Sequence, residues 1–167
     1  MNTNFILAIA PGKRELGVAV FSGFDLVYSA VKIIKHQESQ TSLLEEVTVI
    51  LKKLFREFSI TIVVVKAVSK YQKLSFVLDK VVKRIKFECR KKGLRTVAIK
   101  IEQIKSELCK TGKPTQKKAF ENLLAAYPEL EKYWNRPNKW QNDYYAFLFS
   151  AVAVGTAYLK LFSKISR

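Results

Sequence analysis

The sequence is poor in the residues that build covalent or metal-centred frameworks. Its 167 residues include two cysteines, Cys89 and Cys109, and a single histidine, His36. The cysteines do not have a metal-ligand spacing, and three such residues cannot complete a four-ligand zinc site. We therefore expect reduced thiols and no structural metal, as in a cytoplasmic protein.

Acidic residues are also scarce. Asp and Glu number 14 against 30 Lys and Arg, so the formal net charge is +16. An excess of this size goes beyond what solubility requires and points to a polyanionic partner, of which nucleic acid is the commonest. A basic surface whose lysines are merely solvated is the alternative interpretation.

Uninterrupted apolar runs of membrane-spanning length are lacking. The longest run near the carboxyl end, residues 146–162, is broken by Ser150, Gly155, Thr156 and Lys160. It predicts a packed core helix and no contact with a membrane. The first residues carry no basic segment, so we expect no secretory signal.

With 49% hydrophobic residues, the chain can bury one core, which predicts a single domain over residues 1–167.

The apolar pattern predicts an α/β fold. Strands are expected at 5–10, 17–21, 24–34, 60–65 and 95–101, and helices at 38–58, 74–92 and 115–126, with a final helix after a loop at 127–141. The β-branched run at 60–65 does not alternate, which is typical of a strand buried on both faces. In the helix at 74–92, Phe76, Val81 and Cys89 are expected to face inward. The order predicts a mixed five-stranded sheet flanked by helices.

Four segments, in order, resemble motifs of a known family. Residues 6–20 contain Ala10-Pro11-Gly12 and Gly17, similar to an opening strand and hairpin of the form I-D-P-G-x-x-x-x-G. Residues 63–66 are similar to a strand ending in a catalytic Glu, residues 104–117 to a basic element near bound DNA, and residues 149–154 to a carboxy-terminal D-A-x-A-x-A helix. Together they resemble the RuvC-like branch of the ribonuclease H-like superfamily, the Holliday junction resolvase relatives. The resemblance implies an α/β ribonuclease H-like fold and a homodimer.

The departures from the family pattern fall on its metal ligands. The family cleaves phosphodiesters with two divalent ions, which prefer carboxylate oxygens. Here Ala10, Lys66 and Ser150 stand at the three acidic positions. Unit charges about 4 Å apart at an effective dielectric constant of about 20 repel by roughly 4 kcal/mol, and a divalent ion roughly doubles that energy. We therefore expect no catalytic residues of this kind and no metal cofactor.

Three acidic residues leave an active Mg²⁺-dependent endonuclease as the alternative. Glu15 lies in the first hairpin, Glu102 follows the strand expected at 95–101, and Asp143 lies near the start of the final helix. We interpret Asp143 as an ordinary acidic residue in a first helical turn, where the helix dipole favours it. The other two are interpreted as solvated. A basic protein-interaction scaffold is a third alternative.

Basic residues define the expected nucleic-acid interface. Lys66 is expected to place its ammonium against a phosphate where the family holds metal, although a lysine at a strand end can also reach solvent. The partner expected is junction or structured DNA, or RNA, recognised by shape and charge. The residues assigned to this interface are Lys13, Arg14, Lys66, Lys70, Lys73, Lys105, Lys110, Lys113, Lys117 and Lys118.

Overall fold

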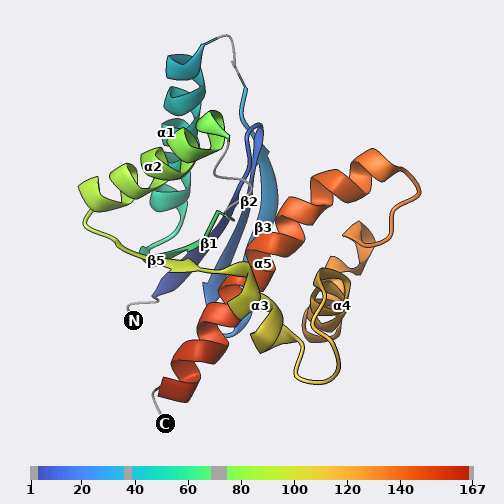
Figure 1. Ribbon diagram of the computed structural model, residues 1–167. Helices are drawn as coiled ribbons and strands as arrows, with labels where there is room; N and C mark the ends of the chain where they lie inside the picture. Colours follow the sequence, from blue (N-terminus) through green and yellow to red (C-terminus); the bar gives the residue numbers. More distant parts are fainter. Residues whose placement is uncertain (1–3, 36–38, 69–74, 166–167) are drawn as a thin grey trace.

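A computed structural model describes residues 4–35, 39–68 and 75–165 of the chain. It confirms the α/β class, with one mixed sheet between two layers of helices (Figure 1). The elements are β1 (Phe5–Pro11), β2 (Glu15–Ser22), β3 (Asp25–Ile33), α1 (Gln40–Glu57), β4 (Ile60–Lys66), α2 (Phe76–Lys91), β5 (Arg95–Ile99), α3 (Ile101–Leu108), α4 (Gln116–Ala126), the 3₁₀ helix η2 (Pro128–Tyr133) and α5 (Lys139–Ile165).

The five strands lie in the order β3-β2-β1-β4-β5. The first three form an antiparallel meander, whereas β4 pairs in parallel with both β1 and β5. Because α1 and α2 are the crossovers between parallel strands, they cover one face of the sheet. The opposite face is covered by α5, with α3 and α4 beside it (Figure 1).

The alternation of side chains along the central strands divides the core in two. Leu7 and Ile9 of β1 pack under α1 and α2, while Ala8 and Ala10 belong to the core under α5. In β4, Val63 and Val65 lie on the first face and Val64 on the second. The strand expected at 60–65 is therefore buried on both faces over Val63–Val65, although Thr61 is exposed, and the period of two places Lys66 on the face that α5 covers.

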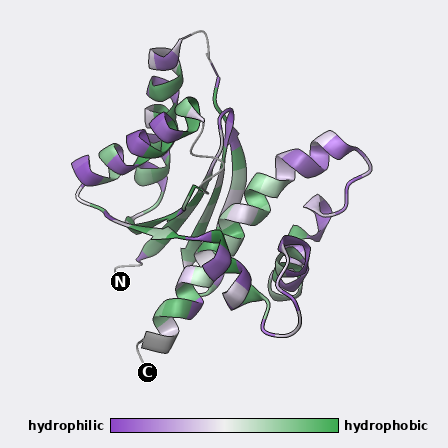
Figure 2. Cartoon of the chain, viewed as in Figure 1, coloured by the Kyte–Doolittle hydropathy of each residue, from purple (hydrophilic) through white to green (hydrophobic). Residues whose placement is uncertain are grey.

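Small residues let α5 pack close to the sheet. A Cβ atom on Gly155 would overlap the ring of Phe21, so only glycine fits at this crossing of helix and strand. Over Lys139–Ser163 the helix has the length and hydropathy of a membrane span, but 61% of its apolar window is buried inside the fold. The core-helix prediction is thus supported, and Figure 2 shows the helix changing from hydrophilic at its amino end to hydrophobic along the sheet.

Three expectations about local structure were wrong. β5 ends at Ile99, so the strand expected at 95–101 was too long, and residues 101–108 form the helix α3, which was not predicted. Phe76 was expected in the core but is 64% exposed, because the helix begins there and Leu78 turns inward instead. The loop expected at 127–141 contains η2 and the first residues of α5.

Candidate functional site

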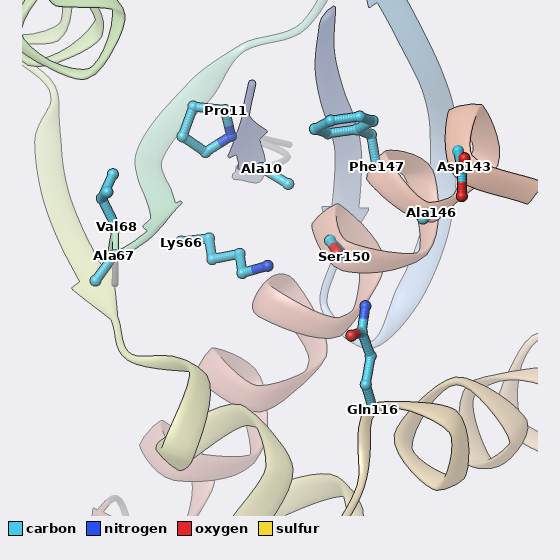
Figure 3. A pocket seen from close by; sticks show the side chains of 10 residues that line it. All are labelled: Ala10, Pro11, Lys66, Ala67, Val68, Gln116, Asp143, Ala146, Phe147 and Ser150. Carbon is cyan, nitrogen blue, oxygen red and sulfur yellow. The ribbon is translucent and has the colours of Figure 1, made fainter. Parts of the chain in front are cut away.

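A pocket opens at the carboxyl ends of β1 and β4, against the side of α5 (Figure 3). Its volume is about 230 Å³. Strands, the segment after β4, and two helices contribute its lining, which consists of Ala10, Pro11, Lys66, Ala67, Val68, Gln116, Asp143, Ala146, Phe147 and Ser150. The three positions that depart from the family pattern, Ala10, Lys66 and Ser150, therefore meet in one place.

Strand register explains why Ala10 and Lys66 meet. β1 and β4 are parallel neighbours, and their pairing runs to Ile9 opposite Val65. The next residues along each strand are Ala10 and Lys66, which share the face toward α5. Ala10 is 2% exposed and Ser150 is 8% exposed, so both lie within the wall of the pocket.

Lys66 is the cation at the centre of this pocket. Figure 3 shows its side chain extending from the end of β4 toward α5. Burial of the ammonium lowers the pKa of Lys66, and the positive charge of Lys105 lowers it further. Both effects disfavour the charged form, so the free amine is more accessible here than on an exposed lysine.

Lys105 reaches this site from α3, the helix that the sequence analysis missed. An adjoining pocket is lined by both lysines together with Gln116, Phe120 and Ser150. The two pockets share Lys66, Gln116 and Ser150 in their linings and so lie next to each other. Gln116 was not predicted as a site residue, because a glutamine at the start of a helix carries no distinguishing signal in a single sequence.

Phe147 closes the side of the pocket next to the first hairpin. A Cβ atom on Gly12 would lie 2.6 Å from a ring carbon of Phe147, so the absence of a side chain there makes room for the ring. The aromatic ring supplies no oxygen ligand and fills space beside Pro11.

The side chains at the site do not fit a pair of divalent ions. Asp143 is the single carboxylate among the lining residues, and the other oxygen donors are the Ser150 hydroxyl and the Gln116 amide. Two Mg²⁺ ions need several anionic oxygens, whereas this pocket holds an ammonium. Within residues 4–35, 39–68 and 75–165, no three His, Cys, Asp or Glu side chains gather as a metal-binding group.

The three alternative acids lie in different surroundings. Asp143 is exposed and lines the pocket. Because α5 begins at Lys139, Asp143 lies in the second helical turn, and the prediction that it lies in the first turn was wrong. Glu15 begins β2 outside the pocket lining, where burial raises the pKa of its carboxyl despite the charge of Arg14. Glu102 is exposed in the first turn of α3, also outside the lining. The structure thus brings only Asp143 to the site.

The remaining basic residues of the expected interface are dispersed. Lys113, Lys117 and Lys118 are exposed around the turn at Gly112, on the side of the molecule that carries α4. Lys110 forms an ion pair with the buried Glu107 at 3.1 Å. Lys13 and Arg14 lie in the β1–β2 turn, beside the start of α1. Lys70 and Lys73 fall outside the described residues.

The two tryptophans, Trp134 and Trp140, differ in how far their rings are packed against the core. Trp134 packs edge-on against Phe120 and Phe149, with ring centroids 6.1 and 5.3 Å apart, and so fixes the segment after η2 onto the core. Trp140 was expected in the same loop but lies in α5 and is 66% exposed.

Comparison with known proteins identifies the fold. No family model and no curated protein sequence matches the chain. Thermus thermophilus RuvC superposes with a TM-score of 0.76 at 15% identity, covering 97% of this chain and 96% of that one. The same protein in complex with a Holliday junction substrate gives 0.74 at 14% identity, over 96% and 95%. The yeast mitochondrial Holliday junction resolvase gives 0.68 at 8% identity, over 98% and 82%. The chain therefore has the RuvC-like ribonuclease H fold.

Proposed function

We propose that this protein binds branched or structured DNA through phosphate contacts and does not cleave it by metal-dependent chemistry. The proposal is supported by the fold, which it shares with a RuvC that is bound to a Holliday junction substrate. It is also supported by the net charge of +16, since phosphate contacts supply most of the affinity of such proteins. No pattern of side chains suited to reading base edges is apparent, so recognition of shape is the expected mode.

The observation that carries the proposal is the make-up of the pocket at the ends of β1 and β4. Ala10, Lys66 and Ser150 line it where the resemblance expects carboxylates. A lysine in place of an acid converts a site for cations into a site for anions. A phosphate oxygen near Lys66 would supply the negative charge that the pocket lacks and would raise the lowered pKa of the amine. The ammonium then acts as a phosphate contact.

A metal-dependent endonuclease is the second candidate, and Asp143 is the observation that favours it. Its carboxylate lies at the rim of the same pocket and is free to turn inward with its exposed side chain. One carboxylate beside an ammonium is a weak site for Mg²⁺, however, because the lysine repels the ion. The proposal therefore ranks binding without cleavage above this activity.

A binding panel tests both candidates. The full chain is titrated against a labelled four-way junction, the matching duplex, a single strand and an RNA hairpin, at about 50 and about 200 mM salt. The junction is expected to bind most tightly and to be weakened by salt. The same complexes are then incubated with Mg²⁺ or Mn²⁺, and the junction is expected to stay intact.

Each contrary outcome of the panel points to a different function. Metal-dependent cleavage that disappears in Asp143→Asn would establish the endonuclease. Tightest binding to the hairpin would make RNA the partner. An absence of binding, or binding that salt leaves unchanged, would favour a protein-interaction scaffold.

We also propose that the protein acts as a homodimer. Phe76 and Phe87, one at the start of α2 and one near its end, are 64% and 51% exposed. They lie on the same outer side of the helix, since Lys80 and Arg84 between them each approach one of the rings. Two such exposed rings on one helix face favour burial against a second copy of the chain.

A further inference from the structure

Lys66 combines two features of lysines that react as nucleophiles. Its side chain lies among apolar groups, with Ala10, Pro11 and Val68 in the same pocket lining. A second cation, Lys105, shares the adjoining pocket. Desolvation and a neighbouring positive charge are the two arrangements by which proteins turn a lysine into an amine nucleophile.

The one carboxylate that lines the pocket of Lys66, that of Asp143, is exposed at its rim and is not ion-paired with the amine. Among the ion pairs of the described residues, none involves Lys66. Burial and the charge of Lys105 both lower its pKa, so the free amine is more accessible than on an exposed lysine. The pocket is open, and its volume of about 230 Å³ leaves space around the amine for a substrate group.

We propose that Lys66 forms a Schiff base with the ring-opened aldehyde of an abasic deoxyribose in bound DNA. The inference rests on the proposed function, because the DNA backbone must reach this pocket. An abasic site is the aldehyde that DNA itself carries, and its missing base leaves the sugar free to turn into a pocket of this size. Intact DNA offers no aldehyde, and there Lys66 stays a phosphate contact.

The reaction balances without a metal ion, an oxidant or a reductant. The neutral Nζ amine adds to C1′ to give a carbinolamine, and the hydroxyl group of this intermediate takes a proton from solvent and leaves as water to give the iminium. The carboxylate of Asp143, which lines the same pocket, accepts the proton from C2′. The released electron pair forms the C2′–C3′ double bond and breaks the bond from C3′ to O3′, which frees a strand ending in a 5′-phosphate. Water then hydrolyses the imine and restores Lys66.

Borohydride trapping tests the proposal directly. The full chain is incubated in EDTA with a duplex that carries one abasic site, and sodium borohydride is added to reduce the imine to a stable amine. A covalent complex is expected, and mass spectrometry of its peptides should place the adduct on Lys66. Asp143→Asn should retain the adduct but slow strand scission, since it removes only the proton acceptor.

Matched variants separate this chemistry from the background of a lysine-rich surface. Lys66→Arg keeps the positive charge but has no primary amine, so the adduct should disappear while DNA binding persists. Lys53→Ala removes an exposed lysine of α1, on the opposite side of the sheet from the pocket, and should leave the adduct unchanged. Trapping that is equal in the wild type and in Lys66→Arg would overturn the proposal.

A tetrahydrofuran analogue of the abasic site distinguishes a failure of this inference from a failure of the proposed function. The analogue has the same shape but no aldehyde, so it reports binding alone. Binding of the analogue without any trapping of the true abasic site would overturn the Schiff base and leave DNA binding standing. No binding of either DNA would overturn both.

Discussion

The backbone of Gly17 in β2 lies directly against the backbone of Phe147 in α5, so that a Cβ atom on the glycine would overlap the phenylalanine carbonyl group. Gly17 also pairs with Ala10 across the hairpin. This contact sets how closely the final helix approaches the sheet. It therefore sets the width of the pocket that holds Lys66.

Gly17→Ala should destabilise the fold by at least about 1–3 kcal/mol, the usual cost of overpacking, because rigid backbone cannot move aside as a side chain can. The free energy of unfolding in urea measures the effect. Gly23→Ala is the matched control: nothing lies within 4 Å of its added Cβ atom, and only the positive φ of 58° opposes it. Equal losses in the two variants would contradict the role of the Gly17 contact.

Lys66→Met should stabilise the protein by about 0.5–2 kcal/mol near neutral pH, as removal of a functional but unfavourable buried group often does. The folded-state pKa of Lys66 is lowered from 10.5, so the unfolded chain binds a proton that the folded chain lacks. The wild type should therefore gain stability as the pH rises through the lowered pKa toward 10.5, and the advantage of the variant should shrink.

Urea unfolding at about pH 7 and about pH 10 gives the comparison for Lys66. Lys83→Met is the control, because Lys83 is 67% exposed and pairs with Asp79 on the surface of α2. A stability difference between Lys66→Met and the wild type that stays constant with pH would show that Lys66 titrates normally.

Replacement of Lys113, Lys117 and Lys118 by alanine should weaken junction binding and flatten its salt dependence. Each phosphate contact that is lost lowers the slope of log K against log salt by about 0.9. Lys110→Ala should change the slope less, since its ammonium already pairs with Glu107. Fluorescence anisotropy over a salt series measures the affinity and its salt dependence. An unchanged slope in the triple variant would show that these three lysines do not contact phosphates.

Phe87→Glu should convert a homodimer into monomers, because a carboxylate on the outer face of α2 would be buried without a partner at the interface. Light scattering coupled to gel filtration reports the mass. Phe24→Glu, at a residue 53% exposed in the β2–β3 turn, should leave the mass unchanged. A wild-type mass of one chain would refute the dimer before any variant is made.

The long elements of the fold were predictable because their patterns are strong. The run at 60–65 lacks alternation and is buried on both faces, and Ser39 caps α1 by accepting from the backbone of Ser42, as its residue type predicts. Helix α3 was missed for a physical reason. It has eight residues, and its N-cap position is occupied by Lys100 instead of Ser, Thr, Asp or Asn. Gln103 accepts a hydrogen bond from the Lys100 amide at 2.9 Å.

The candidate site was predictable in part. The resemblance to family motifs pointed to Ala10, Lys66 and Ser150 from the sequence alone. The strand register explains why Ala10 and Lys66 meet in the structure. The roles of Lys105 and Gln116 depend on how α3 and α4 pack against α5, which no local pattern encodes. The position of Asp143 at the rim depended on where α5 begins, and the end residues of a helix are less securely assigned than its interior.

The pairing of β1 with β4 makes the absence of carboxylates at positions 10 and 66 resistant to reversal by single mutations. An aspartate introduced at position 10 would stand next to Lys66 and form an ion pair with it, which removes the new charge from any incoming ion. A glutamate at position 66 alone would face a pocket in which Asp143 is the only other carboxylate among the lining residues. A divalent-ion centre would thus be recovered only by several substitutions together. A chain with one of these substitutions would still not bind the ion, so single mutations at these positions would bring no advantage over the present residues.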